Sequence, residues 1–300
     1  MRRLCALIAA VAGTASAQEY IMMPDSTSDA IMLFDPFDGS LVDANYIDLT
    51  TSGIASTPVN ANVVGNQIWV SDQLGDGIMR YDMAGNHLGN IVGGMDNVRG
   101  FEVVGNTVYL SNSGSNNGAP GDAVITIDVA TASITGSFAV GSAKDGDPFD
   151  VLSFQGGLLI NDIAGENIEV HDLAGGWVSN FHDSDGVTGI DFPEQMNMSL
   201  DGQSVFAAGF SSPSGIYEFD LSGNQINYYD VGSGLRGVME LGNGNIMFSN
   251  SSGVHVLDPA TGGMTQVASG SGRYFEVLIP APSSLALLGL GGIVAVRRRR

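Results

Sequence analysis

The sequence of 300 residues predicts an all-β fold, a six-bladed β-propeller, and three observations carry this prediction. A segment of about 44 residues recurs six times between the two ends of the chain, and units of four short strands with this period are typical of propeller blades. Apolar and polar residues alternate within its strands, as at Gly77–Asp82, which is the period of a β-strand. No long helical pattern occurs outside the two ends of the chain.

The first 17 residues have the pattern of a secretory signal peptide. Arg2-Arg3 gives a positive start, residues 4–11 are apolar, and Ala15-Ser16-Ala17 has the form of a cleavage site. Signal peptidase is therefore an expected partner; a buried first helix is the alternative interpretation. Cys5 is the single cysteine and lies in this segment, so the mature chain is predicted to have no disulfide and no cysteine-bound metal.

Each unit of the repeat contains the same succession of strands and turns. An apolar strand, such as Gln67–Ser71, leads into Ser-Asp or Ser-Asn, and a polar turn follows it. The next strand ends in aspartate, and a turn of glycine and small residues leads to a last strand, as at His87–Val92. The strand-ending aspartates recur at intervals of 38 to 48 residues: Asp35, Asp82, Asp128, Asp172, Asp220 and Asp258.

The order of the strands predicts how the ring closes. Five units have an inner strand ahead of this pattern, as at residues 101–104, whereas the first unit has none. The repeats end with Arg-Tyr-Phe-Glu-Val-Leu at 273–278, which matches Arg-Gly-Phe-Glu-Val-Val at 99–104. We therefore predict that residues 273–279 form the inner strand of the first blade. Residues 18–279 would then be one domain without the open sheet edges that invite aggregation.

The unit from Pro58 to Ile91 resembles the NHL-type propeller repeat. The resemblance rests on Gly-Asn-Gln-Ile-Trp-Val-Ser-Asp at 65–72, Gly-Ile-Met-Arg-Tyr-Asp at 77–82 and Gly-Asn at 85–86. These residues follow the family's order of a strand, an aspartate and a basic-flanked strand. Proteins of this family serve as binding scaffolds and in some cases as enzymes, so the resemblance implies a fold and leaves the function open.

Residues 280–300 differ from the repeats in composition. Pro280-Ala281-Pro282 precedes an apolar run at 285–296, which is shorter than the about 20 residues that span a bilayer. The chain then ends in four arginines, which would keep this end on the cytoplasmic side: Arg297, Arg298, Arg299 and Arg300. This order resembles the bacterial PEP-CTERM sorting signal, although Ala281 stands where the family name implies glutamate. The resemblance implies an exosortase-like membrane protease, transient membrane contact, and a destination in the cell envelope, cell surface or extracellular matrix.

The charge of the chain excludes one class of partner. The whole chain has 32 acidic and 11 basic residues, and six of the basic residues lie in the two predicted processed ends. The body between those ends therefore carries a formal charge of −27. Such a field repels phosphate backbones, so nucleic acid is not expected as a partner. The predicted destination favours an extracellular polysaccharide or a surface protein.

Charged residues recur at the start of the inner strands, where an arginine precedes the strand in three units and an acidic residue follows closely. They are Arg99, Glu102, Asp150, Arg236, Glu240, Arg273 and Glu276. Because inner strands line the central channel of a propeller, one interpretation is a ring of charges at one channel mouth that binds a polar ligand or an ion. The alternative is pairing of each arginine with a carboxylate of a neighbouring blade, which would leave no charge for a ligand.

Two oxygen-rich loops are candidate calcium sites. Asp145 and Asp147 lie in the first, and Asp183 and Asp185 lie in the second, within His-Asp-Ser-Asp-Gly at 182–186. Calcium takes six to eight oxygen ligands, and the further spacing of an EF-hand loop is absent here. Ordinary turns between strands are the alternative.

We predict an exported propeller with a non-enzymatic binding or scaffolding role. The sequence contains no Gly-x-Ser-x-Gly elbow and no histidine pair with metal-ligand spacing. The alternative function is a calcium-dependent hydrolase of the lactonase type, because such enzymes are six-bladed propellers with a metal in the central channel.

Overall fold

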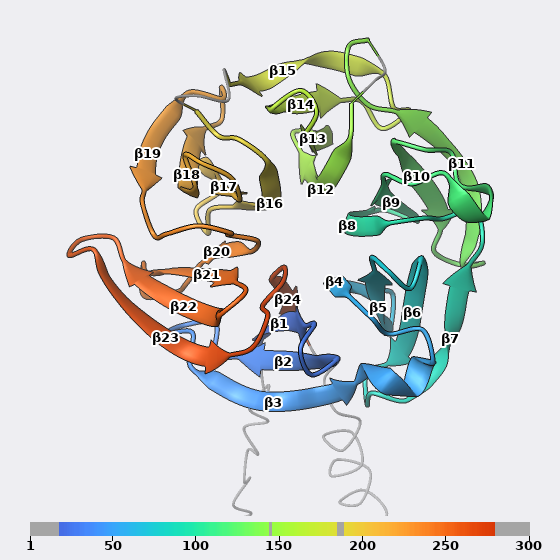
Figure 1. Cartoon of the computed structure of the whole chain (residues 1–300), viewed down its shortest axis with the longest axis horizontal. Coiled ribbons are helices and arrows are strands. Elements are labelled where there is room, and N and C mark those ends of the chain that lie inside the picture. The colour runs from blue at the N-terminus through green and yellow to red at the C-terminus, as the bar shows by residue number, and fades with distance from the viewer. Residues whose placement is uncertain (1–17, 144–145, 185–188, 280–300) are drawn as a thin grey trace, which may run out of the picture. The chain divides into compact units, whose positions relative to one another are not determined.

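The computed structural model describes residues 18–143, 146–184 and 189–279. Residues Tyr20–Leu278 form one compact unit, a ring of six four-stranded antiparallel sheets (Figure 1). This confirms the predicted six-bladed β-propeller. The predicted signal peptide and sorting tail lie outside the described residues. Within the described ranges no helix is long and apolar enough to cross a membrane.

The blades follow one another in chain order, each from its inner to its outer strand. Blade 1 contains β24 (Glu276–Leu278), β1 (Tyr20–Asp25), β2 (Ala30–Phe34) and β3 (Leu41–Asp48). Blade 2 contains β4 (Pro58–Val64), β5 (Gln67–Asp72), β6 (Gly77–Asp82) and β7 (His87–Val92). Blade 3 contains β8 (Val98–Val104), β9 (Thr107–Asn112), β10 (Ala123–Asp128) and β11 (Ser133–Ala139).

The second half of the ring repeats this order. Blade 4 contains β12 (Pro148–Phe154), β13 (Gly157–Asp162), β14 (Asn167–His171) and β15 (Trp177–Asp183). Blade 5 contains β16 (Pro193–Met198), β17 (Ser204–Gly209), β18 (Gly215–Asp220) and β19 (Gln225–Tyr229). Blade 6 contains β20 (Val238–Glu240), β21 (Ile246–Asn250), β22 (Gly253–Asp258) and β23 (Gly263–Ser269). Two short 3₁₀ turns, η1 (Leu49–Ser52) and η2 (Asn116–Gly118), lie in loops.

The apolar core lies between neighbouring blades. One cluster joins Met22 and Ile31 of blade 1 to Ile68 and Met79 of blade 2, and all four side chains are fully buried. Full burial of a side chain of this size stabilises the fold by about 1.5–3 kcal/mol. The middle strands are therefore apolar on both faces, whereas most residues of the outer strands, such as β3, are exposed. The alternation in the sequence reflects these two environments.

The last strand of the described chain closes the ring. β24 pairs antiparallel with β1, with Tyr20 opposite Leu278 and Met22 opposite Glu276. This confirms the predicted closure of blade 1 by the C-terminal strand. Leu278 is 1 % exposed and Phe275 is fully buried, so the closure contributes to the core as well as to the sheet. The first and last paired residues of the ring are thus neighbours at one end of blade 1.

The recurring aspartates close the turns between the third and fourth strands. The carboxylate of Asp82 accepts hydrogen bonds from the backbone N–H groups of Ala84 and Asn86, both at 2.9 Å. Gly85 stands between them at φ +82°, a conformation that glycine adopts without steric cost. Asp220 makes the same two bonds to Ser222 and Asn224. These contacts confirm the predicted turns.

Candidate functional site

Four of the six inner strands share one irregularity, a β-bulge near their first residue. β8 pairs Val98 with Asn112 and Phe101 with Leu110, so Arg99 and Gly100 together stand opposite the single residue Ser111. β4, β12 and β16 show the same register shift. A bulge turns the strand locally and redirects its side chains. The repeated bulge therefore determines which residues reach the channel axis.

The first residue of the bulge forms a ring around the axis. Arg236 holds this place in blade 6, because its backbone N–H donates to the carbonyl oxygen of Ser249 at 2.9 Å. Arg273 holds it in blade 1, because the preceding residue, Gly272, forms an antiparallel β-bridge with Asp25. We call the six residues at this position the bulge ring. They are Val59, Arg99, Phe149, Glu194, Arg236 and Arg273.

Side chains of the preceding blade hold the backbone of the bulge ring. The Ser71 hydroxyl donates to the carbonyl oxygen of Arg99 at 2.5 Å, and the Ser249 hydroxyl donates to that of Arg273 at 2.6 Å. Two equivalent bonds join Ser111 to Phe149 and Asn161 to Glu194. All four donors come from the second strand of a blade: three are the serine of its Ser-Asp or Ser-Asn ending, and Asn161 takes that place in Asn-Asp of β13, so this position joins neighbouring blades.

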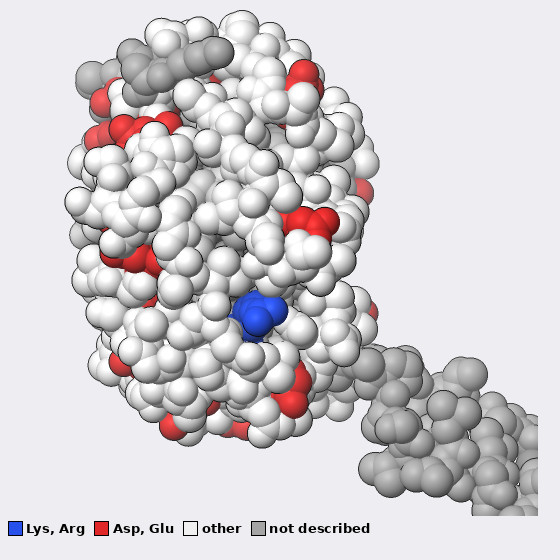
Figure 2. Space-filling model, turned by 90° about the vertical axis from the view of Figure 1, so that its right-hand side faces the viewer, with Lys and Arg blue, Asp and Glu red and all other residues white. Residues whose placement is uncertain are grey.

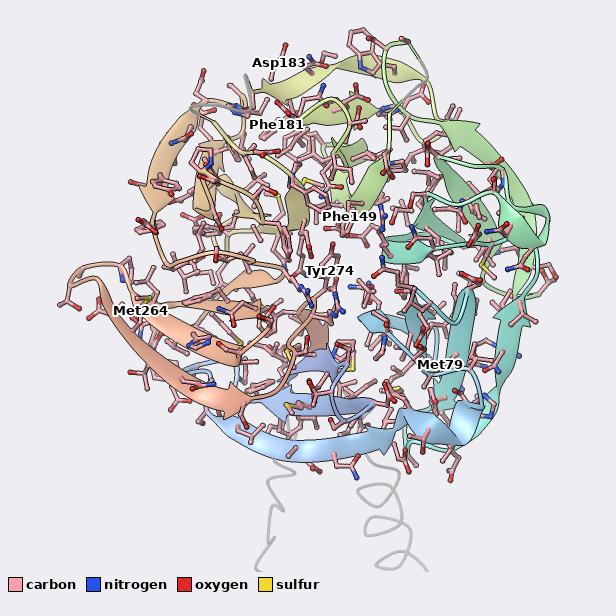
Figure 3. The ribbon with its side chains drawn as sticks, viewed as in Figure 1. Met79, Phe149, Phe181, Asp183, Met264 and Tyr274 are labelled. Carbon is pink, nitrogen blue, oxygen red and sulfur yellow. The ribbon has the colours of Figure 1, made fainter. Side chains whose placement is uncertain are left out.

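An apolar plug fills the axis beside the charged members of the ring. Val59, Phe149 and Tyr274 form one buried cluster, and Figure 3 shows Phe149 and Tyr274 near the centre of the ring. The Tyr274 hydroxyl is buried and has no hydrogen-bond partner among the described residues. Burial and the nearby carboxylates, Glu194 first, raise the pKa of Tyr274. The plug is therefore an apolar cluster that contains one polar group without a hydrogen-bond partner, the Tyr274 hydroxyl, among the described residues.

Arg99 is neutralised by the neighbouring blade. Its Nη1 lies 3.1 Å from Oδ1 of Asp147 and also donates to the carbonyl oxygen of Pro148 at 3.4 Å. Its guanidinium carbon lies 3.8 Å from the centroid of the Phe149 ring, a cation–π contact. Arg99 therefore follows the second of the two interpretations of the charged positions, in which an arginine pairs with a carboxylate of a neighbouring blade.

Arg236 and Arg273 have no such partner. Arg236 Nη1 donates to Ser271 Oγ at 3.2 Å, and Arg273 Nε donates to Ser26 Oγ at 3.3 Å. Among the described residues, neither guanidinium has a carboxylate within 4.0 Å. Burial, followed by the nearby charge of Arg236, lowers the pKa of Arg273 to about 10. The charge of Glu194 acts in the opposite direction and raises the pKa of Arg273, so this carboxyl group lies nearby without forming an ion pair in the described ranges.

Glu194 is the acidic member of the bulge ring, and sequence reasoning did not find it. It is 4 % exposed and forms no ion pair within 4.0 Å in the described ranges. Burial raises the pKa of Glu194 to about 7, although the charges of Arg236, Arg273 and Arg99 each lower it. One signal could have found it: Pro58, Pro148 and Pro193 all begin inner strands, and the next residue always belongs to the bulge ring.

Of the other predicted carboxylates, Glu102 and Glu276 lie further along their strands than the bulge ring, and Asp150 is the second bulge residue of β12. Glu102 and Glu276 stand three residues after Arg99 and Arg273, and a rise of about 3.3 Å per residue places them roughly 10 Å along the strand. Both oxygens of Glu102 accept backbone N–H groups, and Asn60 Nδ2 donates to Glu276 at 3.2 Å. Asp150 accepts from Met196 N–H at 2.8 Å.

Burial shifts the pKa values of these three carboxyl groups in the same direction. Burial raises the pKa of Glu102, and it raises the pKa values of Asp150 and Glu276 well above their usual range. The charge of Glu102 adds to the shift in both Asp150 and Glu276. In the described ranges, none of the three forms an ion pair with Arg236 or Arg273 within 4.0 Å.

Glu240 holds a different register from Glu102 and Glu276. Val238 pairs with Phe248, which makes Met239 the equivalent of Glu102 and moves Glu240 one residue further. Successive side chains of a strand point to opposite faces, so Glu240 does not extend the same row. Its carboxylate accepts the Leu200 N–H at 2.7 Å. The repeated Arg–Glu pattern therefore holds in two blades.

The candidate calcium residues are only partly described. Asp147 pairs with Arg99, and Asp183 is exposed at the end of β15. No group of three or more His, Cys, Asp or Glu side chains that could hold a metal ion occurs in the part of the chain that the structure describes. Outside that part lie Asp145, Asp185, Pro280, Pro282, Arg297, Arg298, Arg299 and Arg300.

Comparison with known families identifies the end of the chain. Residues 278–300 match the PEP-CTERM protein-sorting motif. The chain carries a PEP-CTERM tail. This tail indicates an exported, surface-directed protein, and its first matched residue, Leu278, is also the last residue of β24. No curated protein matches the chain.

Solved structures share the fold of the body at low sequence identity. A chain of the nidogen/laminin complex has a TM-score of 0.64 and 11 % identity, with coverage of 88 % of this chain and 100 % of that chain. A Bacteroides fragilis protein provisionally described as a 6-phosphogluconolactonase has a TM-score of 0.57 and 15 % identity, with coverage of 88 % and 85 %. Hydrazine synthase of Kuenenia stuttgartiensis has a TM-score of 0.52 and 17 % identity, with coverage of 69 % of this chain. This chain spans only 64 % of that chain's length. These likenesses establish the propeller fold and no activity.

Proposed function

We propose that this chain is a non-enzymatic binding protein of the cell envelope or surface, and that its bulge ring holds an acidic group of an extracellular ligand. Signal peptidase would remove residues 1–17, and an exosortase-like protease would process residues 280–300. The observation that carries the binding role is the pair Arg236 and Arg273. Both arginines belong to the bulge ring, and neither guanidinium has a carboxylate within 4.0 Å among the described residues.

The chemistry of the two arginines favours an oxyanion. A guanidinium has five N–H donors in a planar fork that fits carboxylate, sulfate or phosphate oxygens. One donor of each guanidinium bonds to a serine, and the others find no acceptor among the described residues. Removing an ion from water costs several kcal/mol unless it is paired. An acidic ligand group would remove this cost and the repulsion between the two cations.

The charge of the body favours a ligand with few acidic groups. Acidic side chains are spread over the edge of the ring in Figure 2, and basic atoms are confined to one small spot there. Arg99, Arg236 and Arg273 are three of the five basic residues in the body of the chain. A long polyanion would be repelled by the rest of the surface. The site therefore suits a single acidic group, such as the acidic end of a polysaccharide.

Calorimetric titration with galacturonate, and with galactose as its neutral counterpart, tests this proposal on the purified full chain. Galacturonate is expected to bind and galactose is not. Because hydrogen bonds to charged groups contribute about 1.5–3 kcal/mol, Arg236→Met or Arg273→Met should weaken binding roughly tenfold or more. Arg80→Met removes an equal charge from β6, on the third strand, and should leave the affinity unchanged. Equal affinity for both sugars, or wild-type affinity in the Arg273→Met variant, would contradict the proposal.

A further inference from the structure

Glu194 stands where three other blades place arginine. It is the first bulge residue of β16, as Arg99 is of β8, and Arg236 and Arg273 hold this place in the two following blades. Its backbone carbonyl accepts a hydrogen bond from the Asn161 amide of the preceding blade. A buried carboxylate of this kind must be paired or neutral. The surroundings of Glu194 decide between these two states.

Charged and titratable groups reach Glu194 from four neighbouring elements. Arg236 precedes β20, Arg273 and Tyr274 precede β24, Arg99 comes from β8, and Asp150 comes from β12. Burial disfavours the carboxylate of Glu194 and the three arginines favour it, while the charge of Glu194 in turn raises the pKa of Asp150. In the described ranges, no guanidinium lies within 4.0 Å of the Glu194 carboxylate, so the arginines attract this carboxylate without forming an ion pair with it. Burial outweighs the arginines, and the pKa of Glu194 rises to about 7.

We infer that Glu194 is the resident counter-anion of the bulge ring and that it takes up a proton when a ligand oxyanion binds to Arg236 and Arg273. The inference rests on the proposed function, because it assigns the regulation of the same site. The ligand brings one negative charge toward the same guanidiniums. The carboxylate of Glu194 accepts one proton from solvent and becomes a carboxylic acid, so the charge of the ring is unchanged. No covalent bond of the ligand forms or breaks.

Linkage fixes the sign of the effect. If ligand binding favours protonated Glu194, protonation of Glu194 favours ligand binding by the same factor. Affinity for an anion that does not itself titrate must then rise as pH falls from 8 to 6. One coupled proton limits the change to tenfold per pH unit, because one unit of pKa shift equals about 1.36 kcal/mol. The site would thus hold its ligand more tightly in mildly acidic surroundings.

Sulfate is the appropriate probe, since it stays a dianion between pH 6 and 8. The full chain is titrated with potassium sulfate at pH 6, 7 and 8 in imidazole and bis-tris, which are not oxyanions. Because the pKa of Glu194 in the free chain is about 7, we expect binding to be up to about tenfold tighter at pH 6 than at pH 8, and proton uptake near pH 7 to be seen as a buffer-dependent enthalpy. In the Glu194→Gln variant, the affinity for sulfate should change less than twofold between pH 6 and pH 8. Glu218→Gln, on the third strand of the same blade, should keep the pH dependence.

The possible failures are distinguishable. Sulfate binding by the wild-type chain with no pH dependence would overturn the inference and leave the proposed function standing. A pH dependence that persists in Glu194→Gln would also overturn it, provided that the variant melts cooperatively. Absence of both sulfate and galacturonate binding at every pH would reject the proposed function itself, and the inference with it.

Discussion

The Ser249 hydroxyl donates a hydrogen bond to the carbonyl oxygen of Arg273 at 2.6 Å and thereby joins blade 6 to the closing strand. The hydroxyl oxygen of Ser249 also accepts a hydrogen bond from the Gly237 N–H at 2.8 Å, and Ser249 is fully buried. One side chain thus fixes the backbone on both sides of the final junction. Since Arg236 precedes Gly237, the contact also holds both arginines of the bulge ring that have no carboxylate within 4.0 Å among the described residues.

Ser249→Ala is expected to destabilise the fold by about 2–3 kcal/mol, because it leaves a buried carbonyl oxygen and a buried N–H group without this partner. Urea unfolding followed by far-ultraviolet circular dichroism measures the change. Ser269→Ala is the matched control, since Ser269 is exposed at the end of β23 and should change stability by less than about 0.5 kcal/mol. Equal midpoints for the two variants would show that the junction does not depend on this hydroxyl.

A chain that ends at Ile279 should melt like the full-length chain, whereas a chain that ends at Arg273 should lose cooperative melting. The shorter chain lacks Tyr274, Phe275 and Leu278, which are at most 1 % exposed, and deleting a buried aromatic side chain alone costs about 3–5 kcal/mol. It also exposes the edge of β1. Differential scanning calorimetry compares the three chains. A cooperative transition at the same temperature in the shortest chain would show that β24 does not close the ring.

The free energy of unfolding should fall as pH rises from 5 to 8. The folded-state pKa of Glu194 is about 7, and its unfolded value is about 4.3, so the folded chain binds more protons across this range. The stabilisation is fully present below the unfolded pKa and is lost as pH rises through the folded pKa, with a loss of up to roughly 3 kcal/mol. The raised pKa values of Asp150 and Glu276 act in the same direction.

Urea unfolding at pH 5.5 and pH 8 measures this slope in the wild type and in Glu194→Gln, which should show a clearly smaller difference. The turn aspartates, such as Asp82, have lowered pKa values and stay ionised in both states over this range, so they do not mask the effect. A wild-type stability that rises between these two pH values has the wrong sign for a buried carboxyl group that favours protonation.

Calcium should not change the melting temperature. Asp147, one of the four candidate ligands, already bonds to the Arg99 guanidinium at 3.1 Å. A ligand at 100 times its dissociation constant would add about 2.7 kcal/mol to the stability. Melting in 1 mM calcium chloride and in excess chelator should therefore coincide. A rise of several degrees with calcium would favour the metal-dependent hydrolase over the binding protein.

The fold could be predicted because its information is local and repeated. The spacing of Asp82 and its five equivalents reveals the blades, and the match between residues 99–104 and 273–278 reveals the closure. The predictions of the blades and of the ring closure both depend on the strand period and the turn residues, and these recur in each unit. The arginine position could be predicted for the same reason, since Arg99, Arg236 and Arg273 precede similar inner strands.

The partners of the arginines could not be predicted, because they depend on contacts between blades. Nothing local distinguishes Arg99, which reaches Asp147, from Arg273, which reaches Ser26. Glu194 escaped notice because it differs in residue type from the arginines at its own position. Glu240 was grouped with Glu102, although it stands four residues after its arginine rather than three, and this one-residue difference reverses the face of a strand.

The most direct test of the binding role is the position of an anion in the channel. Crystals of the protein soaked in selenate, with data collected at the selenium absorption edge, would locate it without assumptions about the natural ligand. We expect an anomalous peak within hydrogen-bonding distance of the guanidiniums of both Arg236 and Arg273. Selenate bound elsewhere with none at this position, or Glu194 closed directly onto both guanidiniums, would contradict the binding role.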